Sequence, residues 1–337
     1  MHILWFDVFR ILSVYAVIVI HLPIMDVSPW VSWVHSAVPM FALLAGYLSV
    51  RGGLAHDFSL KTVVRQRAER LLIPYLFWTA SYWILNNVCL DCWFSRQMIV
   101  WPSFEDWLRI LLLGGAGPHL WFLPCLFYGQ VLLYFGLWGC RRLRVGTGLF
   151  LTGSFFLVLG CCLWLPGKTS ESILGYLRIY FFRLFLFLLL GAMFARVEPW
   201  VRGHLKPRTV ANRCLLGCAA TGGLALGMQW ASGLIWAHLL IVTGLFWWGL
   251  GIHWDGTQTA PSPEGRMVWI TTLSRCSMGI YLIHVLFTAA INMVAQKWGT
   301  VYFSAWLGLL LAAIIYAVSL AVVWGGLRSP VLRRVLS

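Results

Sequence analysis

Two ionisable residues, Arg10 and His21, stand eleven positions apart in the first apolar stretch of the chain. Such side chains are costly inside a membrane span and usually mark a functional site. In an α-helix both would share one face, roughly 16 Å apart along the axis. Because histidine can take a proton from a hydroxyl group and return it to a leaving group, the pair predicts His21 as a general base beside a cationic partner. An inner-leaflet anchor and a hydrogen-bonded interfacial histidine fit the spacing equally well.

A second basic group, Arg65, Arg67 and Arg70, comes just before the third apolar stretch. At positions i and i+3 of a helix, Arg67 and Arg70 would face the same side. Guanidinium groups bind phosphate through forked hydrogen bonds, so the group predicts a site for a phosphate-bearing donor. Basic residues at an inner helix end also fix the orientation of a span, and this alternative stays open.

Two more segments carry polar side chains among apolar ones. His119 and Trp121 follow a Gly/Pro-rich break, where the histidine is placed to orient an acceptor or the acyl carbonyl and the tryptophan to stack on a sugar. Both also fit ordinary interfacial residues. Ser277, Tyr281 and His284 lie at i, i+4 and i+7, on one stripe of a predicted helix. Such a stripe either lines a site or holds two helices together.

The composition shows which elements must position these residues. Of the 337 residues, 60% are hydrophobic and 11% are charged, against about 45–50% and about 25% in soluble domains. A bilayer core requires about 20 apolar residues per helix. The apolar runs predict spans near residues 4–24, 33–50, 69–88, 107–138, 146–165, 179–196, 212–230, 234–253, 268–295 and 303–325. We therefore expect an all-α polytopic transmembrane bundle of about ten spans, forming one domain over residues 1–337.

The distribution of charge predicts the topology. Net charge is +14, and the positive-inside rule places most lysines and arginines on the cytoplasmic side. With a cytoplasmic N-terminus the outer loops keep only Arg96, Arg109, Lys168, Arg178 and Lys297. This asymmetry predicts an even number of spans with both termini in the cytoplasm. We expect the protein in the cell (inner) membrane as a multi-pass protein.

Nucleic acid and metal are not expected as partners. No basic patch interleaved with aromatic residues lies outside the predicted spans. The spacing of Cys89 and Cys92 allows a disulfide in a predicted outer loop, and a single Cys-x-x-Cys pair is a weak metal signal. The oligomeric state is left open by the sequence.

Taken in order, these motifs resemble the acyltransferase-3 family of integral-membrane acyltransferases, which O-acetylate surface polysaccharides, lipopolysaccharide and related molecules. The resemblance runs from Arg10 to about Phe287. It is carried by Arg10 with His21, Val38 to Leu48, Arg67 to Tyr75, Pro118 to Leu123, and Ser277 to His284. The family's second-span motif has a serine where this chain has Ala45, so a hydroxyl role there does not carry over.

The resemblance implies an acyl-CoA donor at the cytoplasmic face, with acetyl-CoA expected, and His21 as the catalytic base with Arg10 as its partner. It also implies that the basic residues of the inner loop lie near the CoA phosphates. The implied activity is O-acyl transfer to a hydroxyl of a cell-surface or exported glycan, or of a lipid-linked glycan. A transporter or flippase is the alternative, but it would show two related halves and broken midplane helices. The sequence shows neither.

Overall fold

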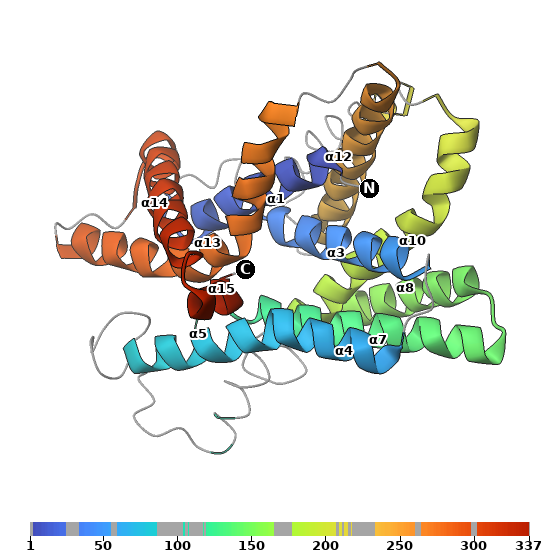
Figure 1. The fold of residues 1–337 in the computed structure, drawn as a ribbon, viewed down its shortest axis with the longest axis horizontal. Helices are drawn as coiled ribbons and strands as arrows, with labels where there is room; N and C mark the ends of the chain where they lie inside the picture. The colour runs from blue at the N-terminus through green and yellow to red at the C-terminus, as the bar shows by residue number, and fades with distance from the viewer. Residues whose placement is uncertain are drawn as a thin grey trace.

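The fold is that of a helical bundle (Figure 1). The computed structural model describes residues 3–24, 34–54, 59–85, 104, 107, 117, 119–164, 177–206, 209–210, 212–214, 217, 233–259, 264–297 and 302–336. Within these ranges the ordered elements are helices, and the only β-type pairing is one isolated bridge between Ile24 and Phe303. The all-α class predicted from the sequence is therefore confirmed for the described residues.

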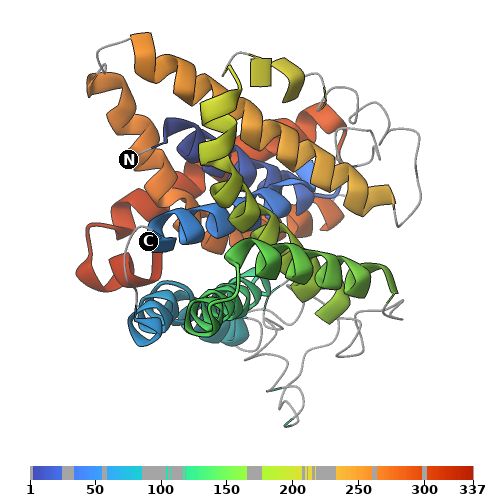
Figure 2. The ribbon, with the colours of Figure 1, turned by 90° about the vertical axis from the view of Figure 1, so that its right-hand side faces the viewer.

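The described residues form α-helices and two π-helical turns. In order they are α1 (Leu4–Ile20), α3 (Ala37–Leu54), α4 (Leu60–Arg67), the π-helical turn η1 (Ala68–Leu72), α5 (Ile73–Ile84), α7 (Phe122–Leu143), α8 (Thr147–Trp164), the π-helical turn η3 (Leu177–Phe182), α10 (Arg183–His204), α12 (Gly233–Thr259), α13 (Glu264–Lys297), α14 (Ala305–Gly326) and α15 (Pro330–Leu336). Figures 1 and 2 both show α4, α5 and α7 along one side of the molecule, with α12 on the opposite side of α3.

Five described helices are long and apolar enough to cross a membrane. They cover Phe122–Leu143, Tyr180–His204, Ile235–Trp254, Trp269–Ala295 and Ala305–Gly326. Two shorter apolar helices cover Ala37–Gly52 and Thr147–Leu163. The chain is thus a membrane protein, as expected. The count of ten spans and the cytoplasmic termini stay predictions, and most of the predicted span 212–230, like Cys89 and Cys92, lies outside the described residues.

Helix α1 lies inside the bundle, where it contacts α3, α12, α13 and α14. Its buried face includes Val14 and Ile18, both with no exposed surface. The helix contains no glycine or proline, so nothing interrupts its hydrogen bonding between Leu4 and Ile20. Helix α1 is therefore uninterrupted, and it places Asp7 and Arg10 near its start and His21 at its end.

Helices α3 and α10 approach each other closely at two glycines. A Cβ atom on Gly46 would overlap the carbonyl group of Leu188, and one on Gly191 would overlap the carbonyl group of Leu43. Small residues allow helix backbones to meet in a membrane, where lipid competes for apolar contacts. The two helices therefore form a closely packed pair, and this pair positions Tyr47 and Arg51 of α3 beside Glu198 of α10.

Candidate active site

Three histidine rings meet where α1 ends. His21 is the residue directly after α1, and its side chain is half-buried. The backbone N–H of His21 donates to the Ile18 carbonyl at 3.1 Å. Its ring centroid lies 6.3 Å from that of His119 and 5.3 Å from that of His284. The His119 and His284 centroids are 5.3 Å apart. Three candidates that are far apart in the sequence thus form one triangle, which we call the histidine cluster.

The protonation pattern of two members follows from their hydrogen bonds. His119 Nε2 donates to the Leu282 carbonyl at 3.2 Å, and His284 Nδ1 donates to the Tyr281 carbonyl at 2.7 Å. Since a carbonyl oxygen only accepts, these nitrogens carry the hydrogens of the neutral rings. His119 Nδ1 and His284 Nε2 are buried without a hydrogen-bond partner among the described residues. Each therefore offers a lone pair beside His21.

Two buried tyrosines fasten the backbone around the histidine cluster. Tyr82 donates to the Leu282 carbonyl at 2.7 Å, and its ring centroid lies 5.2 Å from that of His119. Tyr281 donates to the backbone carbonyl of His119. Helices α5 and α13 and the turn before α7 are thereby linked. Sequence reasoning missed Tyr82; the available signal was a tyrosine in an apolar span, where its hydroxyl needs a partner.

The other predicted residues of these segments lie outside the histidine cluster. Trp121 is half-buried and packs on Tyr180, with ring centroids 4.6 Å apart. Ser277 is buried and donates to the Leu273 carbonyl at 3.5 Å, within its own helix. The predicted stripe on α13 is thus divided: His284 belongs to the histidine cluster and the Tyr281 ring lies 5.5 Å from that of His119, while Ser277 bonds one turn back.

Arg10 belongs to a second polar group near the start of α1. Its Nη1 lies 3.4 Å from Asp7 Oδ1, and the same oxygen accepts a 2.6 Å hydrogen bond from Ser274 Oγ of α13. Asp7 is buried, whereas the Arg10 side chain is 38% exposed. Arg70 is close enough to repel Arg10. Because α1 is helical from Leu4 to Ile20, Arg10 lies roughly 16 Å along the axis from His21.

The arginines before the third apolar stretch face different ways. Arg65 is exposed and pairs with Glu69 at 2.8 Å, and this hydrogen bond raises the pKa of the Arg65 guanidinium group. Arg67 Nη2 instead lies 3.3 Å from the hydroxyl of Tyr134 in α7. That hydroxyl donates to the Ser49 carbonyl of α3 at 3.2 Å. Arg67 therefore points into the bundle and Arg65 away from it, while Arg70 lies near α1.

Comparison with known proteins identifies the family. A family model described as an acyltransferase domain matches residues 3–328, nearly the whole chain. The chain belongs to the acyltransferase-3 family. The resemblance found in the sequence motifs is thereby confirmed, and the chain is a membrane acyltransferase. No curated protein and no solved structure matches it.

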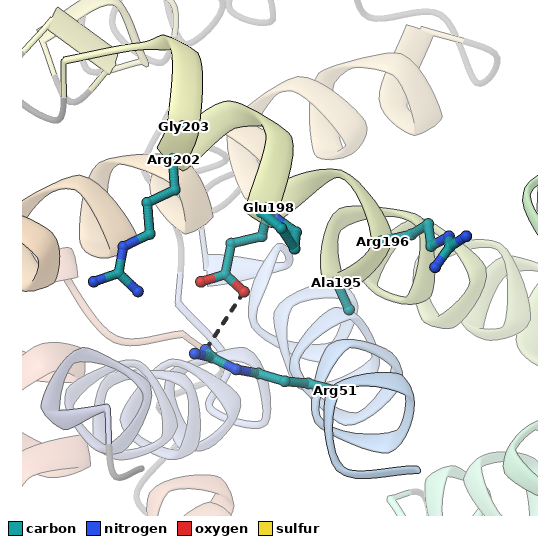
Figure 3. A pocket seen from close by; sticks show the side chains of 7 residues that line it. Arg51, Ala195, Arg196, Glu198, Arg202 and Gly203 are labelled. Carbon is teal, nitrogen blue, oxygen red and sulfur yellow. Dashed lines mark ion pairs between the residues drawn. The ribbon is translucent and has the colours of Figure 1, made fainter. Parts of the chain in front are cut away.

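This acyltransferase also has a cavity of about 650 Å³ at the ends of α3 and α10 (Figure 3). Its lining residues are Arg51, Ala195, Arg196, Glu198, Pro199, Arg202 and Gly203. Sequence reasoning used these arginines only to orient the spans. The signal it passed over was Glu198, a single acidic residue within an arginine-containing segment of an apolar helix.

The described residues of this acyltransferase contain no group of three or more His, Cys, Asp or Glu side chains that could hold a metal ion.

Proposed function

We propose that this acyltransferase moves an acyl group, with acetyl expected, from cytoplasmic acyl-CoA to a hydroxyl of a cell-surface or exported glycan, or of its lipid-linked precursor. One observation supports the proposal above others: His21 meets two buried imidazoles, and each of them has a lone pair without a partner. A hydroxyl group is a weak nucleophile at neutral pH, so its acylation needs a base within hydrogen-bonding reach. His21 is the side chain best placed for this task.

In the proposed step, His21 takes the proton of the acceptor hydroxyl as its oxygen attacks the thioester carbonyl. The carbon–sulfur bond then breaks, and the departing thiolate of CoA takes the proton from the His21 imidazolium. The ring centroids of His21 and His284 are 5.3 Å apart, which lets their nitrogens come within hydrogen-bonding reach. In the proposed reacting pose, His284 Nε2, which has no hydrogen-bond partner among the described residues, accepts from the His21 N–H and leaves the other nitrogen of His21 facing the acceptor, so His284 is a positioning residue.

The donor enters from the cytoplasm in this proposal, because both termini and the α4 segment are assigned to that side. Helix α1 then runs outward, with Arg10 near the inner face and His21 deeper. The orientation of Arg67 into the bundle and the closeness of Arg70 to Arg10 support phosphate contacts at the inner end. The thioester arm of the donor would extend along α1 toward His21.

The acceptor approaches from the outer side, where α7 begins. His119 reaches the histidine cluster from the turn before α7, and Trp121 lies directly at the start of that helix. An aromatic ring at this position suits stacking on a sugar. Membership of an acyltransferase family favours this reading over the transporter alternative.

The experiment measures acetyl transfer by the purified protein in detergent. The acceptor is surface glycan from a strain that lacks the protein, and mass spectrometry counts the acetyl groups added. His21→Ala should lower turnover by about 10²–10⁴-fold, the usual contribution of a general base. His204→Ala, which changes an exposed histidine on α10, should leave turnover unaltered. His21→Ala within about threefold of wild type, far below that contribution, would remove His21 from the mechanism.

A further inference from the structure

The cavity between α3 and α10 has a basic lining. Its lining includes three arginines, Arg51, Arg196 and Arg202, and one carboxylate, that of Glu198. Figure 3 shows the guanidinium groups of Arg51 and Arg202 on the same side of α10 as this carboxylate, whereas Arg196 points away. The described lining therefore keeps a surplus of positive charge after Glu198 is counted. A ligand that fits this surplus is an anion that accepts hydrogen bonds from guanidinium groups.

Arg51 is held in place before any ligand binds. The Glu198 carboxylate, only 5% exposed, lies 3.6 Å from Arg51 Nη1 and accepts a 2.6 Å hydrogen bond from the Tyr47 hydroxyl. Arg51 in turn donates to that hydroxyl. A guanidinium group fixed in this way loses less freedom when it binds an anion. The Arg51–Glu198 ion pair is sufficient to join α3 to α10. The additional arginine in the lining, Arg202, is not needed for that contact.

The position of the cavity relates it to the histidine cluster. The ring of Tyr47 lies 5.2 Å from that of Phe6 in α1. Phe6 precedes His21 by fifteen residues, or roughly 22 Å along the helix axis. The pantetheine arm of CoA separates the thioester from the nucleotide by a long extended chain. With the thioester at His21, the nucleotide therefore reaches the inner ends of α1, α3 and α10.

The last turn of α3 also separates two sets of arginines. On one side, Arg67 reaches the Ser49 carbonyl through Tyr134. On the other side, Arg51 faces the cavity with Arg202. The diphosphate of CoA lies between the arm and the ribose, nearer to α1, whereas the 3′-phosphate projects from the ribose at the far end. A phosphate monoester carries about 1.5–2 negative charges at pH 7 and three acceptor oxygens, so it can accept hydrogen bonds from both Arg51 and Arg202.

We infer that this cavity is the subsite for the 3′-phosphate of the CoA donor, with Arg202 and Arg51 donating to its oxygens and Glu198 positioning Arg51. The inference rests on the proposed function, because it takes acyl-CoA as the donor. The phosphate headgroup of an anionic lipid offers the same chemistry at an inner membrane surface, so the test must separate the two sources.

The test compares acetyl-CoA with 3′-dephospho-acetyl-CoA as donors. Wild-type kcat/KM should favour acetyl-CoA by roughly tenfold or more, the value of one charge-assisted hydrogen bond. In Arg202→Gln this preference should fall toward unity through a higher KM for acetyl-CoA, with kcat maintained. Arg142→Gln removes the same charge from the exposed inner end of α7 and should keep the preference. Calorimetry with adenosine 3′,5′-bisphosphate should show weaker binding to Arg202→Gln only.

The outcomes distinguish the subsite from the donor. An unchanged preference and unchanged bisphosphate binding in Arg202→Gln would overturn the subsite while leaving acyl transfer from CoA intact. Absence of transfer from both thioesters, with no bisphosphate binding to wild type, would overturn the acyl-CoA donor and the subsite with it. Nanodiscs containing phosphatidylglycerol supply the lipid arm: if Arg202→Gln lost bound phosphatidylglycerol but no nucleotide affinity, the site would be a lipid site and the inference wrong.

Discussion

Replacing His284 by asparagine tests whether this residue positions His21. The amide of asparagine keeps a donor near the place of Nδ1, which bonds the Tyr281 carbonyl at 2.7 Å, but it removes the buried Nε2. His21 becomes positively charged during the proposed step, and a hydrogen bond from a charged group contributes about 1.5–3 kcal/mol. At about 1.4 kcal/mol per factor of ten, the loss in turnover should be roughly 10- to 160-fold.

Initial rates at saturating donor and acceptor measure this loss, together with thermal unfolding in detergent. His284→Gln places an amide oxygen near the position of Nε2 and should retain more activity than His284→Asn. His204→Asn is the matched control, since His204 Nδ1 also bonds a carbonyl one turn back, that of Trp200 at 2.9 Å, but on an exposed surface. Equal losses in His284→Asn and His284→Gln, with unaltered melting, would refute the positioning role.

Two further predictions concern the support of the site and the donor. Gly46→Ala should destabilise the protein by about 1–3 kcal/mol, as overpacking does, because the new methyl group overlaps the Leu188 carbonyl; the melting temperature should fall, whereas Gly52→Ala, with open space around it, should not lower it. Arg67→Ala combined with Arg70→Ala should raise KM for acetyl-CoA more than it lowers kcat, because contacts far from the thioester bind substrate and transition state alike. Unchanged donor saturation would limit these arginines to setting topology.

The sequence predicted most of the helices because lipid imposes a simple rule on length and polarity. The predicted span 146–165 corresponds to α8 at Thr147–Trp164, and 303–325 to α14 at Ala305–Gly326. Boundaries were less accurate where polar residues extend a helix beyond the apolar run. Helix α10 continues to His204, past the predicted end at residue 196. The helix can continue there because Arg196 and Arg202 line the cavity, where their charges need not enter lipid.

The spacing of residues within one helix predicted part of the candidate site. The contacts between helices could not be predicted from that spacing. The stripe of Tyr281 and His284 was visible as a helical period, whereas the approach of His21 and His119 depends on how α1, α7 and α13 pack. The pairing of Arg51 with Glu198 joins residues far apart in the chain. No local pattern predicts such a pair, since either residue alone is an ordinary charged group near a helix end.

A local change of helix type also limited the prediction for the arginines. The expectation that Arg67 and Arg70 share a face assumes α-helical geometry between them. In the structure the π-helical turn η1 occupies Ala68–Leu72, and a π-helix has wider turns than an α-helix. Three residues therefore fall further short of a full turn than in an α-helix, so the two side chains point in more different directions than assumed. This is consistent with Arg67 contacting α7 while Arg70 lies near Arg10 of α1.

The two ends of the proposed reaction path are fixed to each other by a pair of helices. Helix α13 contacts α1 near both ends, through the Ser274 hydroxyl on Asp7 at 2.6 Å and through the ring of His284 beside His21 at 5.3 Å. Asp7 is buried and also holds Arg10, so the inner contact sets the register of α1 against α13. A shift of either helix at the inner end would move His21 relative to His284. Arg10 and His21, the proposed donor-side arginine and the proposed base, are therefore mechanically linked, which gives a physical reason for placing both on one uninterrupted helix.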